Sequence, residues 1–304
     1  MFQIISRRHI YFAISGAVVA ISVASLLVFG IKLGIDFTSG SILRLQFERS
    51  VTSSEIIQAL EDHGVEGASV KTAGENTFLI RSATILSENK AEVESRLQET
   101  LGPVEELSFN SVGPVIGREL TRKAFLAVGV ASLGILVYLT WSFRKVDRPV
   151  RYGVTAVVTL VHDSVILLGA FSILGQIAGM EVDSLFVTAV LTVVGFSVHD
   201  TIVVFDRIRE NRSQHRDKPF SEVVNFSLNQ TIDRSLNTSL TAIFVLAALL
   251  VLGGDTIRDF VLALLIGIAI GTYSSIFTAS CLLAGWEEGD FRKLARLALD
   301  RMRA

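Results

Sequence analysis

Asp200 is a carboxylate inside an apolar stretch, residues 185–205, that is long enough to cross a membrane. Placing a charged side chain at membrane depth costs roughly 2.5–3.5 kcal/mol on insertion scales, so such residues usually have a function. Arg234 enters the next apolar stretch from the same side of the membrane. A carboxylate that meets an arginine inside a bilayer is a candidate site for a proton or an ion.

The two residues are predicted to lie at matching depths. Asp200 precedes the expected helix end near Asp206 by six residues, which places it roughly 9 Å into the membrane, and Arg234 lies five residues after Asn229, roughly 8 Å deep. Antiparallel neighbouring helices would let the side chains pair. Pairing favours the ionised carboxyl and desolvation the neutral acid, so its protonation can change as neighbours move. The alternatives are a static ion pair and side chains that extend to the interface.

Two His-Asp dipeptides, His162-Asp163 and His199-Asp200, lie within apolar stretches. Adjacent residues on a helix point about 100° apart, so neither dipeptide is expected to share a face. Metal ligands on a helix recur at three or four residues, and neither dipeptide has that spacing, so we expect no metal and no other cofactor. Asp163 and His199 are secondary candidates for proton transfer, with packing through hydrogen bonds as the alternative for Asp163.

Two further residues lie close to Arg234. Thr238 follows it by one helical turn on the same face and could donate to a carboxylate or to water, although threonines in helices often bond to the backbone instead. Asp233 adds a carboxylate that could bind Arg234 locally. With His199 beside Asp200, the candidate site is predicted to be a coupled cluster of titratable groups.

The composition predicts a polytopic membrane protein. Half of the 304 residues are hydrophobic, and the mean hydropathy is +0.52. The net charge of −2 suggests no nucleic-acid partner. The one cysteine, Cys281, lies in an apolar run, which excludes an internal disulfide and argues against a redox role.

Six apolar stretches are long enough to span a bilayer. They lie near residues 10–31, 122–143, 151–174, 184–205, 229–252 and 260–284. Lys and Arg concentrate at the N-terminus, in the second and fourth connections and in the C-terminal tail, and six spans place all four on one side. By the positive-inside rule that side is cytoplasmic.

The expected organisation has four parts. They are residues 1–31 with the first span, an extracytoplasmic insert at 32–121, a five-helix bundle at 122–286, and a basic cytoplasmic tail at 287–304. Within the bundle, the charged residues 206–228 form a cytoplasmic loop. This loop is either a membrane-flanking basic segment or an amphipathic element that braces the helices on both sides of it.

The insert shows the order strand, helix, strand, strand, helix, strand. Strands are predicted at 41–47, 68–73, 77–81 and 104–112, and helices at 53–64 and 87–101. Ser53 or Ser54 caps the first helix in this prediction, and Ser87 caps the second. The order is the split βαβ pattern of ferredoxin-like domains. The fold class is therefore an α-helical six-span protein with an inserted α+β domain.

Three strings give the chain a family resemblance. They are GIDFTSG at 34–40, VGFSVHDTIVVFDRIREN at 194–211 and LNQTIDRSLNTSLT at 228–241. Together they resemble the SecF branch of the SecD/SecF family, which belongs to the RND superfamily, and the resemblance covers nearly the whole chain. The strings depart from the usual family pattern at Ser39, where a second glycine is usual, at His199, often Asn, and at Asp233, usually uncharged.

The resemblance implies a non-enzymatic subunit of the Sec export machinery that forms half of an RND-like bundle. Its partners would be SecD, the SecYEG translocon, the translocating preprotein and other membrane accessory subunits. The intramembrane Asp and Arg that the family uses for proton passage fall on Asp200 and Arg234. The remaining alternatives are an RND-type exporter of lipids or small molecules, for which a roughly doubled chain with two large inserts is expected, and a structural tether of the translocon.

Overall fold

The computed structural model describes residues 2–146 and 148–290 and divides the chain into two compact units. One unit is the insert Leu33–Phe125. The other, the helical unit, contains the described residues before Leu33 and after Phe125. The expected tail at 287–304 lies outside the described residues from 291 onward.

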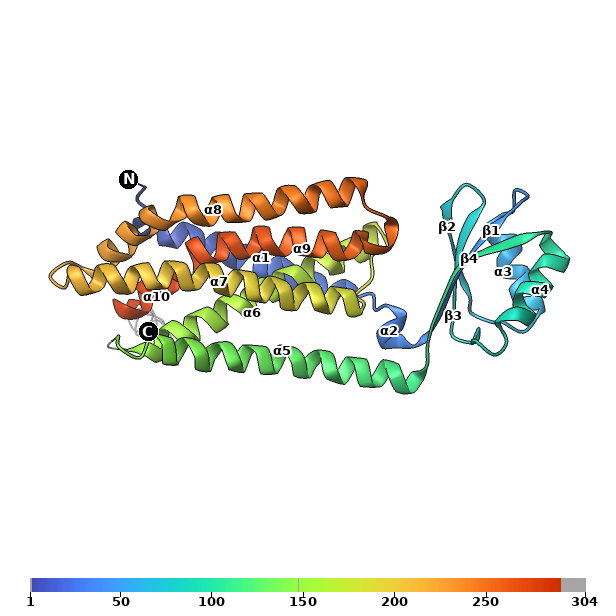
Figure 1. The fold of residues 1–304 in the computed structure, drawn as a ribbon, viewed down its shortest axis with the longest axis horizontal. Helices are drawn as coiled ribbons and strands as arrows, with labels where there is room; N and C mark the ends of the chain where they lie inside the picture. The colour runs from blue at the N-terminus through green and yellow to red at the C-terminus, as the bar shows by residue number, and fades with distance from the viewer. Residues whose placement is uncertain (1, 147, 291–304) are drawn as a thin grey trace, which may run out of the picture. The chain divides into compact units, whose positions relative to one another are not determined.

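The described residues contain six helical stretches that are long and apolar enough to cross a membrane. They are built from α1 (Arg8–Phe29), α5 (Pro114–Ser142), α6 (Pro149–Ile177), α7 (Ser184–Gln214), α8 (Phe220–Leu252), and a sixth stretch made of α9 (Asp255–Tyr273), a π-helical turn (Ser274–Ala279) and α10 (Ser280–Glu287). The six predicted spans are thereby confirmed (Figure 1).

The loop predicted at 206–228 is wrong, because most of it is helical. Helix α7 continues to Gln214 and α8 begins at Phe220, so only residues 215–219 connect them. Arg, Glu and Gln are good helix formers in water, so a helix does not have to end where its apolar stretch ends.

Glycines bring two pairs of helices into close contact. A Cβ on Gly169 of α6 would lie 2.3 Å from the Cβ of Ser22 on α1, and a Cβ on Gly267 of α9 would lie 2.3 Å from a methyl carbon of Val193 on α7. Gly271, one turn after Gly267, approaches Ser197 of α7 in the same way. Small residues allow such close packing in membranes, where apolar burial gives little driving force.

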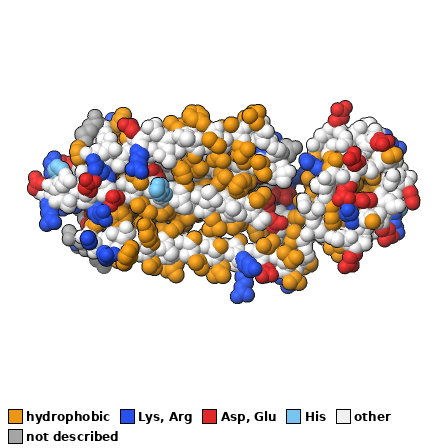
Figure 2. Space-filling view, in the orientation of Figure 1, with side chains coloured by type: hydrophobic (Ala, Val, Ile, Leu, Met, Phe, Trp, Pro, Cys, Tyr) orange, Lys and Arg blue, Asp and Glu red, His pale blue; other side chains and the backbone are white. Residues whose placement is uncertain are grey.

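Helix α5 packs on the bundle through its C-terminal end. Leu139 and Phe143 are buried there, Phe143 stacks on Tyr152 of α6, and Gly153 leaves room for Leu136. Most of the rest of α5 presents apolar side chains outward. Figure 2 shows apolar side chains over the middle of the helical unit, with charged ones gathered at the end where α7 turns into α8.

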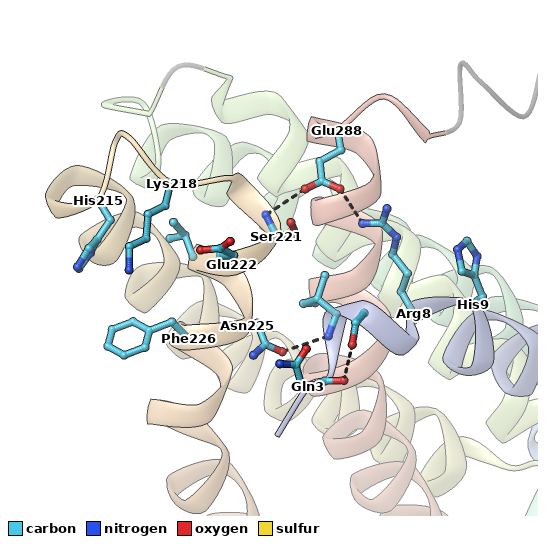
Figure 3. Close-up of a pocket in the computed structure, with 13 residues that line it drawn as sticks. Gln3, Arg8, His9, His215, Lys218, Ser221, Glu222, Asn225, Phe226 and Glu288 are labelled. Carbon is cyan, nitrogen blue, oxygen red and sulfur yellow. Dashed lines mark hydrogen bonds and ion pairs between the residues drawn. The ribbon is translucent and has the colours of Figure 1, made fainter. Parts of the chain in front are cut away.

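The end of the helical unit where α7 turns into α8 is held together by polar contacts to the N-terminal segment. Glu288 accepts hydrogen bonds from the Ser221 amide at 3.1 Å and from Arg8 at 2.8 Å, and Asn225 accepts from the Ile5 amide at 3.2 Å (Figure 3). Burial opposes ionisation of the Glu288 carboxyl, but the bonds from Ser221 and Arg8 outweigh it and hold its pKa below the usual range. These contacts border a hollow of about 630 Å³.

The insert is a four-stranded antiparallel sheet with two helices. In chain order its elements are α2 (Ile35–Thr38), β1 (Gly40–Phe47), α3 (Ser53–Asp62), β2 (Ser69–Gly74), β3 (Thr77–Ser82), α4 (Lys90–Leu101) and β4 (Val104–Val112). The strand order β2-β3-β1-β4 is that of the ferredoxin-like split βαβ, so the predicted fold class is confirmed. A continuous apolar core includes Leu43, Ile56, Ile80 and Leu97.

Both predicted helix caps of the insert are wrong by one or two residues. Thr52 caps α3, because its hydroxyl accepts from the Glu55 amide while Glu55 accepts from the Thr52 amide. Asn89 precedes α4 and accepts from the Leu86 amide, a contact that holds the preceding turn. Ser, Thr and Asn occur close together at both helix starts, and sequence does not decide among them.

The turn before β1 keeps a glycine-like backbone at its serine. Ser39 has φ 67° and ψ 167°, a region that side chains rarely adopt, and Gly40 follows with φ 117°. A Cβ on Gly40 would lie 2.8 Å from the Ser82 carbonyl oxygen. The backbone at position 39 therefore keeps a conformation typical of glycine, although the residue is a serine.

Candidate functional site

Asp200 lies on α7 and faces α8. The residue is 8% exposed, and Oδ1 of its carboxylate accepts a hydrogen bond from the Ser235 hydroxyl at 2.5 Å. The second oxygen, Oδ2, is buried and has no hydrogen-bond partner among the described residues. A buried carboxylate with one unsatisfied oxygen is costly in a membrane, so the position offers a place where a proton can bind.

The predicted Asp200–Arg234 pair is not formed. Arg234 is exposed and makes no ion pair within the described part of the chain. The residue that meets Asp200 is its neighbour Ser235, which lies about 100° further around α8. Residues 200 and 235 touch across two adjacent helices, so the two positions lie level with each other as expected, but the face of α8 was predicted incorrectly.

The three other candidates near this pair lie on outward faces. Thr238 donates to the carbonyl of Arg234 at 2.9 Å, the backbone bond that was the alternative to a functional contact. His199 and Asp233 are exposed. Asp233 makes no ion pair with Arg234 in the described structure. No hydrogen bond or ion pair joins Asp200 to His199, Asp233 or Arg234 within residues 2–146 and 148–290.

Asp163 is the centre of a second buried polar group. Its Oδ2 atom accepts hydrogen bonds from Ser197 of α7 and from Ser274 of the π-helical turn, both at 2.7 Å. Its Oδ1 atom lies 2.9 Å from Nδ1 of His162. The two side chains therefore meet, although adjacent residues on a helix point about 100° apart.

The π-helical turn connects this group to the region of Asp200. The Ser275 hydroxyl donates to the Ser197 carbonyl at 3.0 Å and lies 2.9 Å from the Thr201 hydroxyl. Ser197 and Thr201 lie one turn apart on the same face of α7, and Thr201 directly follows Asp200. Single π-turns within α-helices are frequently found at functional sites. These hydroxyl contacts reach from Asp163 to Thr201, the residue after Asp200, and among the described residues no hydrogen bond continues from them to the Asp200 carboxylate.

The serines of this region were missed at the sequence level. A signal was present on α8, where small hydroxyl residues recur every fourth position and all are buried: Ser227, Thr231, Ser235 and Ser239. Such spacing marks one helix face, and small polar residues are favoured at helix contacts in membranes. No comparable signal marks Ser274 and Ser275, since their contacts with Asp163 and Ser197 depend on the π-helical turn.

The arrangement suits reversible proton binding better than metal or nucleophilic chemistry. The described residues contain no group of three or more His, Cys, Asp or Glu that could hold a metal ion. Cys281 is buried and unpaired. What remains is a pair of buried carboxylates surrounded by hydroxyls, which can act as donors or acceptors as a proton arrives or leaves.

Comparison with known proteins gives consistent matches over the chain. Residues 92–289 match the family described as protein export membrane protein SecD/SecF, C-terminal, and residues 24–51 match the SecD/SecF GG motif. Protein translocase subunit SecF of Thermobaculum terrenum is 46% identical over 97% of this chain and 97% of its own. SecF of Anaerolinea thermophila is 42% identical over 96% of each chain.

A fused relative and a solved structure extend the comparison. The chain is 34% identical to SecDF of Bacillus subtilis over 95% of its own length but only 38% of that protein. The crystal structure of SecDF from Thermus thermophilus, described as a translocon-associated membrane protein, matches with a TM-score of 0.81 and 36% identity. That match covers 94% of this chain and 39% of the other.

Proposed function

The chain belongs to the SecF branch of the SecD/SecF family of protein export membrane proteins, and we propose that it couples the proton gradient to preprotein movement. Together with SecD, it would promote translocation through SecYEG and release of the preprotein on the far side. The membrane in this proposal is the bacterial cytoplasmic membrane. Both termini and the α7–α8 turn face the cytoplasm, in line with the Lys and Arg distribution.

The observation that carries this proposal is the half-satisfied carboxylate of Asp200. One oxygen is held by Ser235 at 2.5 Å and the other is buried without a partner in the described structure. A proton on the free oxygen removes the charge, and its departure restores the charge at the α7–α8 contact. Movement of α7 against α8 changes which of these states is favoured, and this is the coupling that a proton-driven machine requires.

Arg234 is assigned a modulating role in this proposal. It lies next to Ser235 on α8, and its long side chain is exposed in this arrangement. Because the two residues lie about 100° apart around α8, a rotation of that helix would bring the guanidinium toward Asp200 in place of the serine hydroxyl, favouring the ionised carboxylate. Asp163 supports the site from the other side through Ser197, while His199, Asp233 and Thr238 stay on the outer face.

The association with SecD is supported by the fused relatives. In the Bacillus subtilis and Thermus thermophilus SecDF proteins, the region like this chain accounts for 38% and 35% of the length. The rest of those proteins would correspond to a separate SecD subunit here, which completes an RND-like bundle. The inserted unit would then lie on the extracytoplasmic side, available to SecD or the preprotein.

The test is an Asp200→Asn variant reconstituted with SecD and SecYEG in proteoliposomes. The amide keeps the size and one acceptor but cannot bind and release a proton. We expect the stimulation of preprotein release by an imposed proton gradient to fall to the level seen without a gradient. An Asp233→Asn variant is the control, because that carboxylate is exposed one residue from Arg234. Full stimulation in the Asp200→Asn complex contradicts the proposal and favours a structural tether.

A further inference from the structure

A basic hollow lies at the end of the helical unit where α5 meets the last turns of α7. Its volume is about 760 Å³, and five cationic side chains but one carboxylate line it. The cations are Arg144, Lys145, Arg209, Arg212 and Arg216, and the carboxylate is Glu210. None of them belongs to the Asp200 region, so the proposed proton site does not account for this concentration of charge.

Most of this positive charge is not neutralised within the described protein. Arg209 is paired with Asp206 at 2.6 Å, and Glu210 is paired with Arg207 at 2.6 Å. The other four cations have no acidic partner among residues 2–146 and 148–290. Arg212 donates to two backbone carbonyls instead. The hollow therefore presents several unneutralised cations to one volume, which suits a phosphate-bearing anion.

An apolar hollow adjoins the basic one on the outer face of α5. It has a volume of about 460 Å³ and is lined by Val130, Leu133, Gly134, Val137, Tyr138 and Trp141. Trp141 lines both hollows, and the guanidinium of Arg144 lies 4.5 Å from its ring centroid. Tryptophan is enriched at the boundary between acyl chains and headgroups, and a cation over its ring face is attracted by the aromatic quadrupole.

We propose that the two hollows together bind one anionic phospholipid. The phosphate would lie among Arg144, Lys145 and Arg216, and an acyl chain would follow α5 past Trp141 to Gly134. Basic pockets at the ends of transmembrane helices bind such headgroups, and each nearby Lys or Arg adds to the affinity. An acidic protein segment could satisfy the charges, but it would not account for the apolar hollow that continues along a membrane-facing helix.

The test uses Trp141 as its own reporter. The full chain carries two tryptophans, so a Trp286→Phe background leaves Trp141 alone. In nanodiscs of phosphatidylcholine, phosphatidylglycerol with brominated acyl chains should quench Trp141 at a mole fraction on the order of tenfold lower than brominated phosphatidylcholine does. Equal quenching by the two lipids would overturn the proposal.

Charge variants test the headgroup half. Arg144→Gln with Arg216→Gln should abolish most of the preference for phosphatidylglycerol. Arg7→Gln with Lys218→Gln removes the same charge outside both hollows and should leave the preference in place. If the two double variants lower the preference for phosphatidylglycerol equally, the attraction is a diffuse surface effect and the proposed site is disproved. Protection of Trp141 by a Glu-rich peptide, with no lipid preference, would assign the hollow to a protein partner and likewise overturn the proposal.

A glycine variant tests the acyl-chain half without changing charge. A Cβ on Gly134 would meet nothing within 4 Å, so the side chain of Gly134→Leu starts in open space and extends into the apolar hollow that Gly134 lines. Quenching of Trp141 by either brominated lipid should fall. Gly129→Leu on the same helix also has open space and lies outside the hollow, so it should change nothing. Equal behaviour of the two leucine variants would refute the acyl-chain contact.

Discussion

The two units of this chain place polar and apolar side chains in opposite ways. The inserted unit buries Leu43 and Ile80 completely and keeps charged pairs such as Lys90–Glu106 at its surface. The helical unit exposes Leu133 at 62% and buries Asp163 at 2% exposure. In water, removal of apolar surface drives folding; between lipid chains this drive is missing, and close contact with hydrogen bonds replaces it.

The largest expected effect is seen when the same substitution, leucine to alanine, is made once in each unit. Leu43→Ala removes a fully buried side chain from the sheet of the insert and should lower its local unfolding free energy by about 2–5 kcal/mol. Leu133→Ala on the outer face of α5 should cost far less, because the side chain faces lipid in either state. Hydrogen exchange of β1 and β3 amides, and of α5 amides, in nanodiscs measures both.

The comparison of the two leucines is informative whichever way it fails. A loss of protection in α5 as large as that in β1 would mean that Leu133 is covered by protein, for instance by a partner subunit. A small loss in β1 would mean that the core of the insert can close around the missing side chain. Either result would contradict the contrast between a water-driven and a contact-driven unit.

The next effect tests close contact as the stabilising principle of the helical unit. Gly169→Ala would bring a Cβ within 2.5 Å of the backbone Cα of Ser22, so α1 must move away from α6. We expect a cost of about 1–3 kcal/mol, typical of overpacking, in the unfolding free energy measured by steric trapping in bicelles. Gly16→Ala on α1 meets nothing within 4 Å and is the matched control.

The control also excludes an effect of helix propensity. Alanine favours a helix over glycine at both positions, so Gly16→Ala should be neutral or slightly stabilising. If Gly169→Ala is equally neutral, the α1–α6 contact adapts easily, and close packing is not what holds this unit together.

The contrast between the units also accounts for what sequence could predict. Hydropathy defines the six spans, because runs of about 20 apolar residues are rare outside membrane helices, and alternation defines the strands around Leu43. The partner of Asp200 depended on the face that α8 turns toward α7. Arg234 and Ser235 are adjacent on α8, and their side chains point about 100° apart around the helix; Ser235 is the one that contacts Asp200. Only the four-residue spacing of buried hydroxyls on α8 could have indicated that face.

Other failures have the same origin in local choices that tertiary contacts decide. Thr52, Ser53 and Ser54 are all acceptable caps by type, and Glu55 selects the first of them through a reciprocal bond. The π-turn at Ser274–Ala279 has no sequence mark, yet it is what brings Ser274 to Asp163. Periodicity predicts which elements exist, and single side chains then depend on how the elements pack.

The smallest expected effect comes from a surface ion pair of the insert, whose contribution to stability in water is small. The Lys90 ammonium lies 2.5 Å from a carboxylate oxygen of Glu106. This hydrogen bond holds the pKa of Glu106 below the usual range and raises the pKa of Lys90 above it. Burial first, and the neighbouring Glu106 charge second, raise the pKa of Glu94 beside them.

The signs of these shifts predict a shallow pH profile for the stability of the insert. The lowered pKa of Glu106 contributes stability above the ordinary glutamate value of about 4.3, which is lost as pH falls through the folded value. The raised pKa of Lys90 contributes stability below about pH 10.4, and this stability is lost as pH rises through the folded value. The raised pKa of Glu94 opposes the effect of Glu106 in the acid range.

Carbon-13 titration of the carboxyl groups should show the pKa of Glu106 below, and that of Glu94 above, the value of an ordinary glutamate. Lys90→Gln should return Glu106 to the ordinary range, and an unchanged Glu106 titration would show that the surface pair has no measurable energy in water.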